Sequence, residues 1–386
     1  MPRLRAAFYG DDFTGSVDAL LQFARRGWTG RLFVGLPTAD ALGRAAAEVD
    51  VVGIAGIARS LPTADLEGEV RPVLEALVAL GPKFLQYKAC STADSSPSIG
   101  SIGRVLEIGR EVAGAQTVPL VFAQPDFGRY TLHGVHFAHQ TDLPIGSIPF
   151  TAYGDDLADQ LRRSDAAAVV LDAAIDEHLE SIGHAIALLA PPVFAIGSGG
   201  LSLAIAAADG APAIALPTHG DAAGPVLALS GSRSAQTRRQ MDAAAAAGWF
   251  IQPLELEASR AAAQLDWVLS ALRAGQSVGL TSDDADLSGV NRPALEAIAE
   301  AAGAMAAGAA AAGATRRLIV CGGDTSSRVT RLLGVESLSI AANPWGNVVL
   351  LHAHAADTAI DGLELLLKGG QVGSDELFES VRALGG

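Results

Sequence analysis

The amino-acid sequence predicts an α/β protein of two domains, each with a mainly parallel sheet flanked by helices. Short apolar runs alternate with longer helical patterns along almost all of the 386 residues, and this alternation is typical of parallel sheets covered by helices. Most of the apolar runs are rich in Val, Ile, Leu or Phe and lack regular polar alternation, as expected for strands buried on both faces. The length also suits two domains of ordinary size.

The strands are expected where the short apolar runs lie, and the helices between them. Those runs cover residues 5–9, 31–34, 51–55, 84–87, 119–122, 167–171, 193–196, 226–229, 277–280, 317–320, 337–340 and 347–351. The clearest helix spans residues 15–26, where Val17, Leu20 and Leu21 share one face and Gly27 stands where a left-handed glycine would end it. The alternation predicts doubly wound, Rossmann-like sheets.

A polar segment rich in proline and glycine marks the domain boundary. The run PTHGDAAGP at 217–225 separates the strands of the first half from those of the second. Segments of this composition commonly link domains. We therefore place the first domain at residues 1–221 and the second at residues 222–386.

The composition narrows the class of protein. Hydrophobic residues make up 49% of the chain and charged residues 18%, which suits well-packed cores. The net charge of −15 disfavours nucleic acid and anionic membranes as partners, because both would repel the chain. Two cysteines, no signal-peptide pattern and no apolar run of membrane-span length predict a cytoplasmic protein with free thiols. The oligomeric state stays open, and a homo-oligomer is compatible with the sequence.

Ligands of open α/β sheets bind at the carboxyl ends of the strands, so the residues that follow each strand are candidates for function. The first strand leads into the run GDDFTG at 10–15, which holds Asp11 and Asp12 and precedes a helix. One acid can serve as the helix N-cap. Two adjacent acids are more than a cap needs, so a carboxylate that acts as a base or ligand is the second interpretation.

A lysine and a dense set of hydroxyl groups follow the fourth strand. The run is YKACSTADSSP at 87–97, and SIGSIGR follows at 98–104. Lysine supplies positive charge, and each hydroxyl can donate and accept a hydrogen bond, which suits a carboxylate ligand with several hydroxyls. A serine-rich loop without a ligand explains the pattern equally well on its own.

Three glycine-rich turns follow strands in the second half, namely SGSRS at 230–234, VCGGDTSS at 320–327 and LKGGQVG at 367–373. Small residues let backbone N–H groups approach an anion, and a helix N-terminus favours negative charge. One such turn is common in α/β proteins, whereas three in one domain indicate a triphosphate site. The chain contains neither a G-x-x-x-x-G-K-[ST] P-loop nor a G-x-G-x-x-G dinucleotide motif.

The chain resembles the four-carbon acid sugar kinase family along its whole length. The resemblance rests on separated blocks, which are GDDFTGSVDALLQFARRG at 10–27, YKACSTADSS at 87–96, GSGGL at 197–201, SGSRS at 230–234, GGDTSSRV at 322–329 and LKGGQVG at 367–373. Members of that family phosphorylate acids such as threonate or erythronate with ATP. The resemblance therefore implies an ATP-dependent sugar-acid kinase with its active site in the cleft between two domains.

Residue by residue, the resemblance implies a sugar-acid site on the amino-terminal domain and an ATP site on the carboxy-terminal one. The sugar-acid side comprises Asp11, Asp12, Thr14, Lys88, Ser91, Thr92 and Asp94. The ATP side comprises Ser232, Gly322, Gly323, Asp324, Thr325, Lys368, Gly370 and Gly373.

Two departures from the family pattern bear on the identity of the acid. Many members carry an Arg-Gly-Asn element after the Ser-Thr of the second block, but here no arginine follows until Arg104. Many also have a longer stretch with His-Pro pairs where this chain has AHQTDLPIGS after Phe137. Both departures fall in the substrate-facing half, so a branched or oxo-sugar acid is an alternative to a simple four-carbon acid.

The expected reaction is phosphoryl transfer from ATP to a sugar-acid hydroxyl, with Mg²⁺ bridging the phosphates. Asp12 is the first choice for the carboxylate that accepts the hydroxyl proton and Asp11 the second. Neighbouring strand-end residues point in opposite directions, so only one of the two is expected to face the attacked hydroxyl. Lys88 is expected to pair with the substrate carboxylate. Closure of the domains would exclude water.

Two alternatives from other classes remain at this point, a nicotinamide-dependent oxidoreductase of sugar acids and a non-catalytic sugar-acid sensor. The missing dinucleotide motif argues against the first, and the retained acidic pair and glycine-rich turns argue against the second. His133, His136 and His139 recur at three-residue intervals. We interpret them as residues of a turn and strand, with a substrate contact by one of them favoured over a metal site.

Overall fold

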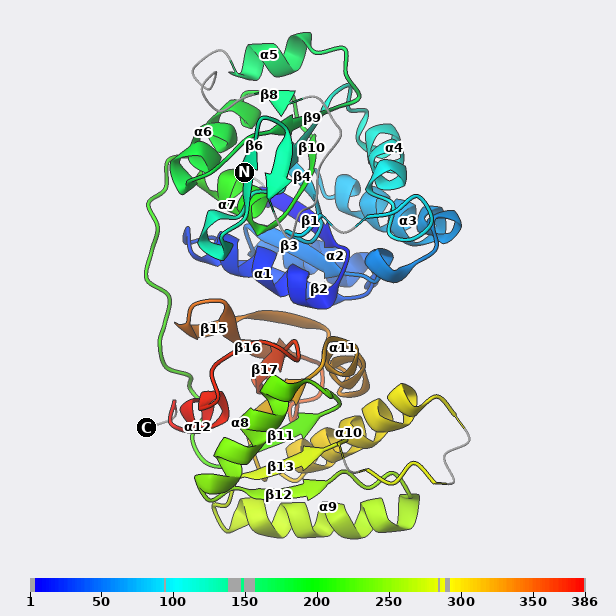
Figure 1. The fold of residues 1–386 in the computed structure, drawn as a ribbon, viewed down its shortest axis with the longest axis vertical. Coiled ribbons are helices and arrows are strands. Elements are labelled where there is room, and N and C mark those ends of the chain that lie inside the picture. Colours follow the sequence, from blue (N-terminus) through cyan, green and yellow to red (C-terminus); the bar gives the residue numbers. More distant parts are fainter. Residues whose placement is uncertain are drawn as a thin grey trace. The chain divides into compact units, whose positions relative to one another are not determined.

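The computed structural model describes residues 4–93, 95–137, 147–148, 157–283, 285–288 and 292–384. The chain folds into two compact units, Met1–Ala215 and Leu216–Gly386. Figure 1 shows the elements of each unit in the order of the chain. The finer limits set from the sequence, residues 1–221 and 222–386, stay a prediction.

The first unit alternates strands with helices. In chain order its elements are β1 (Ala6–Gly10), α1 (Phe13–Ala24), β2 (Gly30–Val34), α2 (Ala39–Glu48), β3 (Val51–Ala55), η1 (Ala58–Ser60), η2 (Thr63–Asp65), α3 (Leu66–Ala79), β4 (Phe84–Lys88), α4 (Ile102–Ala113), β5 (Val118–Val121), η3 (Pro125–Phe127), β6 (Tyr130–Leu132), β7 (Val135–Phe137), β8 (Ser147–Ile148), α5 (Leu157–Arg163), β9 (Ala168–Leu171), α6 (Asp176–Ile186), β10 (Val193–Gly197) and α7 (Gly199–Ala207). The strands of the main sheet pair in parallel in the order β2-β3-β1-β4-β10-β5-β9-β8. Strands β6 and β7 form a separate antiparallel hairpin.

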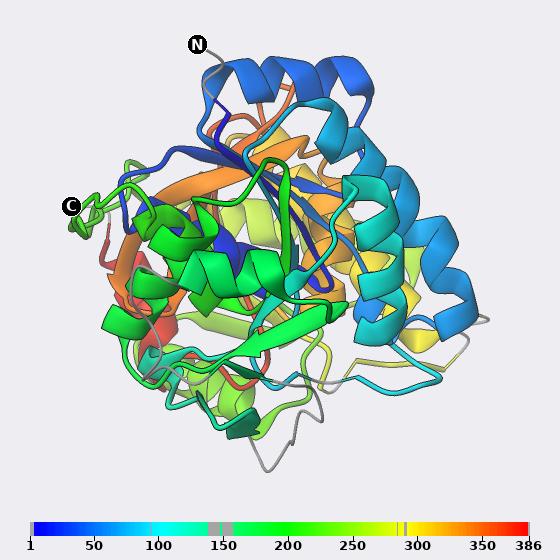
Figure 2. The same ribbon diagram turned by 90° about the horizontal axis from the view of Figure 1, so that it is seen from above.

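Helices cover both faces of this sheet, with α3 and α4 on one side and α6 and α7 on the other (Figures 1 and 2). Side chains of α2, α3 and α4 share a core with Tyr9, Ile54 and Tyr87 of the sheet. All five residues of β1 are buried, which explains why its sequence is continuously apolar. Because helices cover both faces of the sheet, its strand ends are where side chains can contact a ligand.

The second unit repeats the pattern with an antiparallel edge. In chain order its elements are β11 (Val226–Ser230), α8 (Ala235–Ala246), β12 (Phe250–Pro253), α9 (Ala258–Arg273), β13 (Val278–Thr281), α10 (Ala294–Ala311), β14 (Arg317–Cys321), α11 (Gly323–Leu332), β15 (Ser337–Trp345), β16 (Val348–His354), β17 (Glu364–Lys368) and α12 (Leu377–Arg382). Its strands lie in the order β12-β13-β11-β14-β17-β16-β15. They are parallel as far as β17, and β16 is antiparallel to both β17 and β15.

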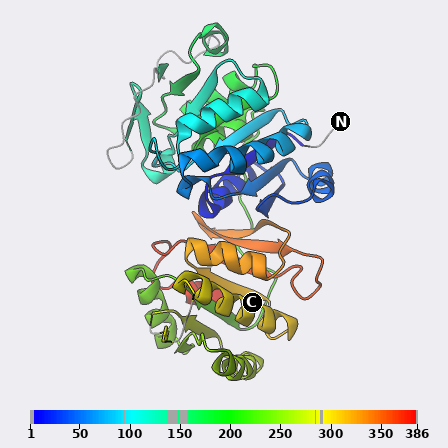
Figure 3. The same ribbon diagram turned by 90° about the vertical axis from the view of Figure 1, so that its right-hand side faces the viewer.

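Helices also cover this second sheet. Met241 of α8 and Phe378 of α12 belong to a core on one face, and α10 and α11 pack together on the other (Figure 3). Helix α10 has the length and hydropathy of a membrane span by composition alone, but half of that stretch is buried inside the unit. Ala302, Ala306 and Ala309 are among its buried residues, so α10 is a core helix whose small side chains allow close packing.

The structure confirms the coarser form of the predicted fold, an α/β protein with mainly parallel sheets flanked by helices. Each predicted strand is present, several of them shifted by a residue or extended. Strands β8, β12 and β17 were not predicted, whereas the β6–β7 hairpin lies where a turn and strand were expected around Gly134. Strand β17 (ELLLK) was hidden because its last residues were assigned to the glycine-rich turn that follows. Cys90 and Cys321 are free thiols, and the cytoplasmic location stays a prediction.

A buried ion pair joins the first residues of β14 and β17 in the second unit. Arg317, at the start of β14, donates to Glu364 Oε2 at 2.6 Å and to the Val381 carbonyl at 2.8 Å, and both charged side chains are at most 2% exposed. Burial alone would raise the pKa of Glu364, but the His352 imidazole, whose Nε2 lies 3.8 Å from Oε1, and hydrogen bonds from the Ala222 amide and the Arg317 guanidinium lower it to about 2. The pair therefore stabilises the fold at neutral pH and loses its effect as the pH falls from 4.5 towards 2.

We expect Glu364→Gln to lower the free energy of unfolding by about 3–5 kcal/mol at pH 7, because it leaves the buried Arg317 charge without its partner. Urea unfolding followed by tryptophan fluorescence measures the change. Glu67→Gln is the matched control, since it removes an exposed partner of Arg71 and Arg104 and should alter stability little. Equal stability of Glu364→Gln and the unmodified chain would contradict this account of the pair.

Candidate active site

The residues predicted to act in the first unit follow strands that lie side by side. Strands β1, β4 and β10 pair in parallel, and their last residues Gly10, Lys88 and Gly197 are in register. The turn that holds Asp11 and Asp12, called the acidic turn below, therefore lies at the carboxyl edge of this sheet. The loop that follows Lys88 and holds Ser91 and Thr92, called the hydroxyl loop below, lies at the same edge. Open α/β sheets bind their ligands at this edge.

Asp12 begins α1 as its N-cap. Its Oδ1 accepts a hydrogen bond of 2.5 Å from the Gly15 N–H, and its Oδ2 pairs with the guanidinium of Arg59 from η1. The Asp12 side chain is 30% exposed. Asp12 is therefore the helix N-cap that was one of the two interpretations. Both of its carboxylate oxygens have partners, the Gly15 N–H and the Arg59 guanidinium.

Asp11 has a different environment, because it is only 4% exposed. Its Oδ1 is buried without a hydrogen-bond partner among the described residues. Burial, followed by repulsion from Asp12, raises the pKa of Asp11 to about 7 against the attraction of Lys88 and Arg59. A carboxyl with an unpartnered oxygen and a pKa near neutrality has the properties of a general base.

Lys88 is buried, with 2% exposure. Its Nζ donates to the Ala89 carbonyl at 3.0 Å and lies 3.6 Å from Asp18 Oδ2. Asp18, on α1, also accepts hydrogen bonds from Gln22 at 2.9 Å and from Gln124 at 3.2 Å. Sequence analysis missed this polar cluster. Asp18 lies inside the first motif block and could have been found there, whereas Gln124 carries no sequence signal of its own.

The loop after β4 supplies the predicted hydroxyl groups. Ser91 is buried, and its Oγ accepts a hydrogen bond from Arg129. Thr92 follows in the same loop, and Thr14 is exposed in the first turn of α1. Asp94, the remaining predicted residue of this side, lies outside the described residues. Arg129 and Arg59 are cations of this edge that the sequence motifs did not reveal.

The β6–β7 hairpin fixes the hydroxyl loop. His136 Nε2 donates to the Ser91 carbonyl at 2.8 Å, and in the neutral ring Nδ1 accepts from the Thr131 hydroxyl at 2.9 Å. Burial lowers the pKa of His136, which favours this neutral form. The buried carboxylate of Asp172 accepts hydrogen bonds from two N–H groups of the hairpin turn. His136 is thus a structural residue, and His139 lies outside the described residues.

The residues predicted for the ATP side also follow neighbouring strands. Strands β11, β14 and β17 pair in parallel, with their last residues Ser230, Cys321 and Lys368 in register. The three glycine-rich turns follow these residues directly. The structure therefore brings turns that are far apart in the sequence to one edge of the second sheet.

Two of these turns are joined by hydrogen bonds. The hydroxyls of Ser234 and Thr237 donate to the Gly370 carbonyl, the latter at 2.9 Å. Lys368 Nζ donates to Thr237 Oγ1 at 3.1 Å, and burial lowers the pKa of Lys368. A Cβ atom on Gly370 would lie 2.5 Å from Ser232 Oγ, so only glycine allows the turns to approach this closely.

The turn after β14 forms the N-terminus of α11. Gly322 is its N-cap with a φ of 108°, a conformation that glycine adopts without strain. Gly323 and Asp324 are exposed in the first turn, and Thr325 is buried. Gly373 closes the third turn with a φ of 90°. Backbone N–H groups at a helix N-terminus, flanked by small residues, can receive the oxygens of a phosphate.

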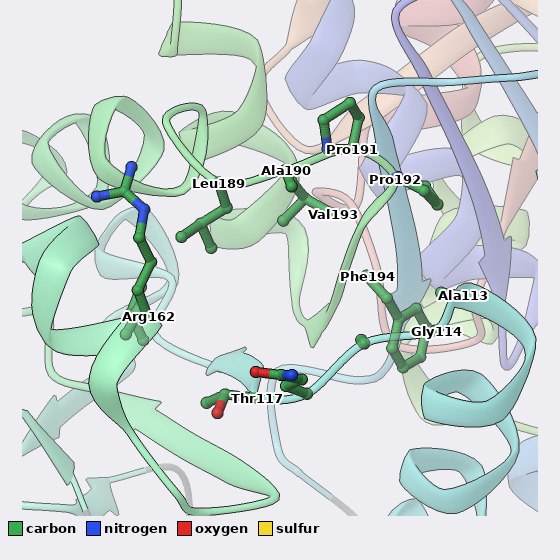
Figure 4. Close-up of a pocket in the computed structure, with 13 residues that line it drawn as sticks. Ala113, Gly114, Thr117, Arg162, Leu189, Ala190, Pro191, Pro192, Val193 and Phe194 are labelled. Carbon is green, nitrogen blue, oxygen red and sulfur yellow. The ribbon is translucent and has the colours of Figure 1, made fainter.

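A cavity of about 330 Å³ lies at the opposite edge of the first sheet (Figure 4). The loop that precedes β10, with Pro191 and Pro192, lines it together with Thr117 and Arg162. Arg162 already pairs with Asp159. None of the predicted site residues lines this cavity, and it stands at the amino ends of β5 and β10, away from the edge where ligands are expected.

Comparison with protein families divides the chain in the same way as its chemistry. A family described as a sugar-binding N-terminal domain matches residues 6–144. A family described as a nucleotide-binding C-terminal domain matches residues 227–378. The acidic turn and the hydroxyl loop fall in the first match, and all three glycine-rich turns fall in the second.

Relatives with named activities span nearly the whole chain. The chain is 33% identical to the 3-oxo-isoapionate kinase of Paraburkholderia graminis, over 98% of this chain and 94% of the relative. It is 29% identical to a 3-oxo-tetronate kinase of Pseudomonas fluorescens, over 100% of this chain and 97% of that protein. It is 27% identical to the D-threonate kinase of Bordetella bronchiseptica, over 97% of this chain and 96% of that protein.

Two solved structures share the fold. One is a Salmonella typhimurium protein with a TM-score of 0.78 and 23% identity, covering 98% of this chain and 99% of that one. The other is a Haemophilus influenzae protein with a TM-score of 0.74 and 20% identity, covering 97% and 99%. At these identities the likeness speaks for the fold alone.

The raised pKa of Asp11 makes a prediction about stability. Because the folded pKa of about 7 exceeds the unfolded value of 3.8, the folded state binds the proton more tightly. The contribution of Asp11 to the free energy of unfolding should therefore decrease as the pH rises from 3.8 to about 7. Asp11→Asn should remove much of this slope, and Asp40→Asn, on the exposed start of α2, should leave it unchanged. Urea unfolding at a series of pH values measures it, and an equal slope in Asp11→Asn would refute the assignment.

Proposed function

This chain belongs to the four-carbon acid sugar kinase family, and from that premise we propose how its residues divide an ATP-dependent phosphoryl transfer. The chain is a kinase of four-carbon or related oxo- or branched sugar acids. The observation that carries the proposal is the separation of chemistry between the units. The unit that matches the sugar-binding family holds the acidic turn and the hydroxyl loop. The unit that matches the nucleotide-binding family holds the three glycine-rich turns.

The proposed substrate is a branched or oxo-sugar acid. The relative with 33% identity is named for 3-oxo-isoapionate, and others are named for 3-oxo-tetronate and D-threonate. The missing Arg-Gly-Asn element and the short segment after Phe137 also favour a branched or oxo-sugar acid, because both departures lie in the half of the chain that is proposed to bind the acid. The oxidoreductase and sensor alternatives have no support among the named relatives.

The proposed ATP site consists of Ser232, Gly322–Thr325, Lys368, Gly370 and Gly373. The N–H groups of the three turns would hold the phosphates, and Lys368 would add positive charge at their base. Magnesium usually contacts one or two carboxylates as well as the phosphates. Asp324, an exposed carboxylate in the first turn of α11, fits that role. A bound Mg²⁺ would neutralise charge that develops on the phosphates.

We assign the proton acceptor to Asp11, in preference to the first choice from sequence, Asp12. Both Asp12 oxygens are occupied, one by the α1 cap and one by Arg59. Asp11 keeps an oxygen without a partner among the described residues, and its pKa of about 7 suits a base at neutral pH. In this assignment Asp12 positions Arg59 and the start of α1.

Lys88 was expected to pair with the substrate carboxylate, but its burial and its nearness to Asp18 favour another role. We propose that the positive charge of Lys88 offsets the negative charge of the acidic turn. This charge lowers the pKa of Asp11, whereas burial raises it. The cleft active site and domain closure expected from the sequence belong to this proposal, because the hydroxyl and the γ-phosphate must meet where water is excluded.

The proposed function is tested by an assay of ADP release from ATP and Mg²⁺. The panel contains threonate, erythronate, 3-oxo-tetronate and 3-oxo-isoapionate, and an NAD-linked absorbance assay with the same acids serves as the control. We expect acid-dependent ADP release with at least one panel member and no change with NAD. An acid-dependent reduction of NAD without ADP release would contradict the proposal.

The assignment of the base is tested by two isosteric variants. Asp11→Asn should lower kcat by about 100-fold or more with little change in the KM for ATP. In the unmodified chain, kcat should rise with pH through about 7, because Asp11 must be ionised to accept the proton. Asp12→Asn should act mainly through a higher KM for the acid. A larger fall of kcat in Asp12→Asn than in Asp11→Asn would return the role to Asp12.

A further inference from the structure

A cation that faces the carboxylate favours binding of a sugar acid, and it also offsets the repulsion expected from a chain with a net charge of −15. The cations at the carboxyl edge of the first sheet include Arg59, Lys88 and Arg129. Two of them already face acids of the chain. Arg59 pairs with Asp12, and the buried Lys88 lies 3.6 Å from Asp18.

Arg129 differs from both. Its guanidinium donates a hydrogen bond to Ser91 Oγ and stands 5.8 Å from the centre of the Phe127 ring. Within the described parts of the chain it forms no ion pair. A guanidinium has five N–H donors, so among the described residues its single neutral hydroxyl partner leaves the charge unbalanced and most of the donors available. Arg129 is half-buried, which raises the value of an added negative partner.

The backbone around Arg129 is firmly held. Gln124 and Arg129 exchange two backbone hydrogen bonds, of 2.9 Å and 3.3 Å. Strand β6 begins at the next residue, and its hairpin is bound to the Ser91 carbonyl through His136 at 2.8 Å. The hydrogen-bonded backbone therefore holds the Arg129 guanidinium next to the hydroxyl loop. This preorganisation reduces the entropy lost when a ligand binds.

We propose that Arg129 binds the carboxylate of the sugar acid and thereby sets the preference for an acid over a neutral polyol. The inference rests on the proposed function and assigns a residue that neither the motifs nor the resemblance supplied. The planar fork of arginine matches the two oxygens of a carboxylate. Ser91, which bonds to the same guanidinium, and Thr92 then lie where the hydroxyls of the same substrate can be contacted.

The test compares Arg129→Gln, Arg129→Lys and Ser91→Ala with the unmodified chain, using the panel acid with the highest kcat/KM. Arg129→Gln should raise the KM for the acid by about 10- to 100-fold, the effect of losing a hydrogen-bonded charge. The KM for ATP should not change. Arg129→Lys should recover part of the loss, because it keeps the charge without the fork. Arg44→Gln, an exposed position on α2, is the matched control.

A second readout separates carboxylate recognition from a structural role. Inhibition by the polyol that carries CH₂OH in place of the carboxylate should be equal in Arg129→Gln and the unmodified chain. Calorimetric binding of the acid without ATP should be lost in Arg129→Gln, whether or not turnover is measured. A KM within twofold of the unmodified chain in both Arg129 variants would overturn the assignment. An unmodified chain that binds the acid but never releases ADP would instead overturn the proposed function.

Discussion

Parallel strand pairing determines where the chemistry of this chain can lie. In the first unit, the register of β1, β4 and β10 ends Gly10, Lys88 and Gly197 at one level, so the residues that follow them share one edge. In the second unit, the same constraint gathers the turns after β11, β14 and β17. Because helices cover both faces of each sheet, the strand ends are the places where polar groups can gather without breaking a core.

The two ends of the same strands serve different purposes in the second unit. At the amino ends of β14 and β17, Arg317 and Glu364 form a buried pair whose charges satisfy each other. At the carboxyl ends, Lys368 is buried with neutral hydrogen-bond partners, and the neighbouring turn ends in a helix N-terminus. The Arg317–Glu364 pair contributes to stability because each charge has a partner. The charge of Lys368 has no acidic partner among the described residues, and together with the nearby N–H groups it can bind an anion. In the first unit, the corresponding group is Asp11, whose Oδ1 is buried without a hydrogen-bond partner in the part of the chain that the structure describes.

Strand positions and strand-end motifs could be predicted from the sequence, because apolar runs and glycine turns are local signals. The roles of Asp11 and Asp12 could not, because choosing between a cap and a base requires knowing which carboxylate meets Gly15 and Arg59. Arg129 carries no local signal at all. It reaches Ser91 because the β6–β7 hairpin folds back on the loop after β4, and the turn and strand expected around Gly134 gave no sign of that contact. Contacts across such distances in the sequence depend on topology.

The central claim is that the nucleotide and the sugar acid bind to different units, each at the carboxyl edge of its own sheet. Hydrogen–deuterium exchange of the whole chain, with and without a non-hydrolysable ATP analogue and Mg²⁺, tests it most directly. The account predicts slower exchange of backbone amides at 230–234, 322–327 and 368–373 when the analogue binds. It predicts no comparable protection at 10–16 and 88–93, which the acid alone should protect. Nucleotide protection confined to the acidic turn and the hydroxyl loop would contradict it.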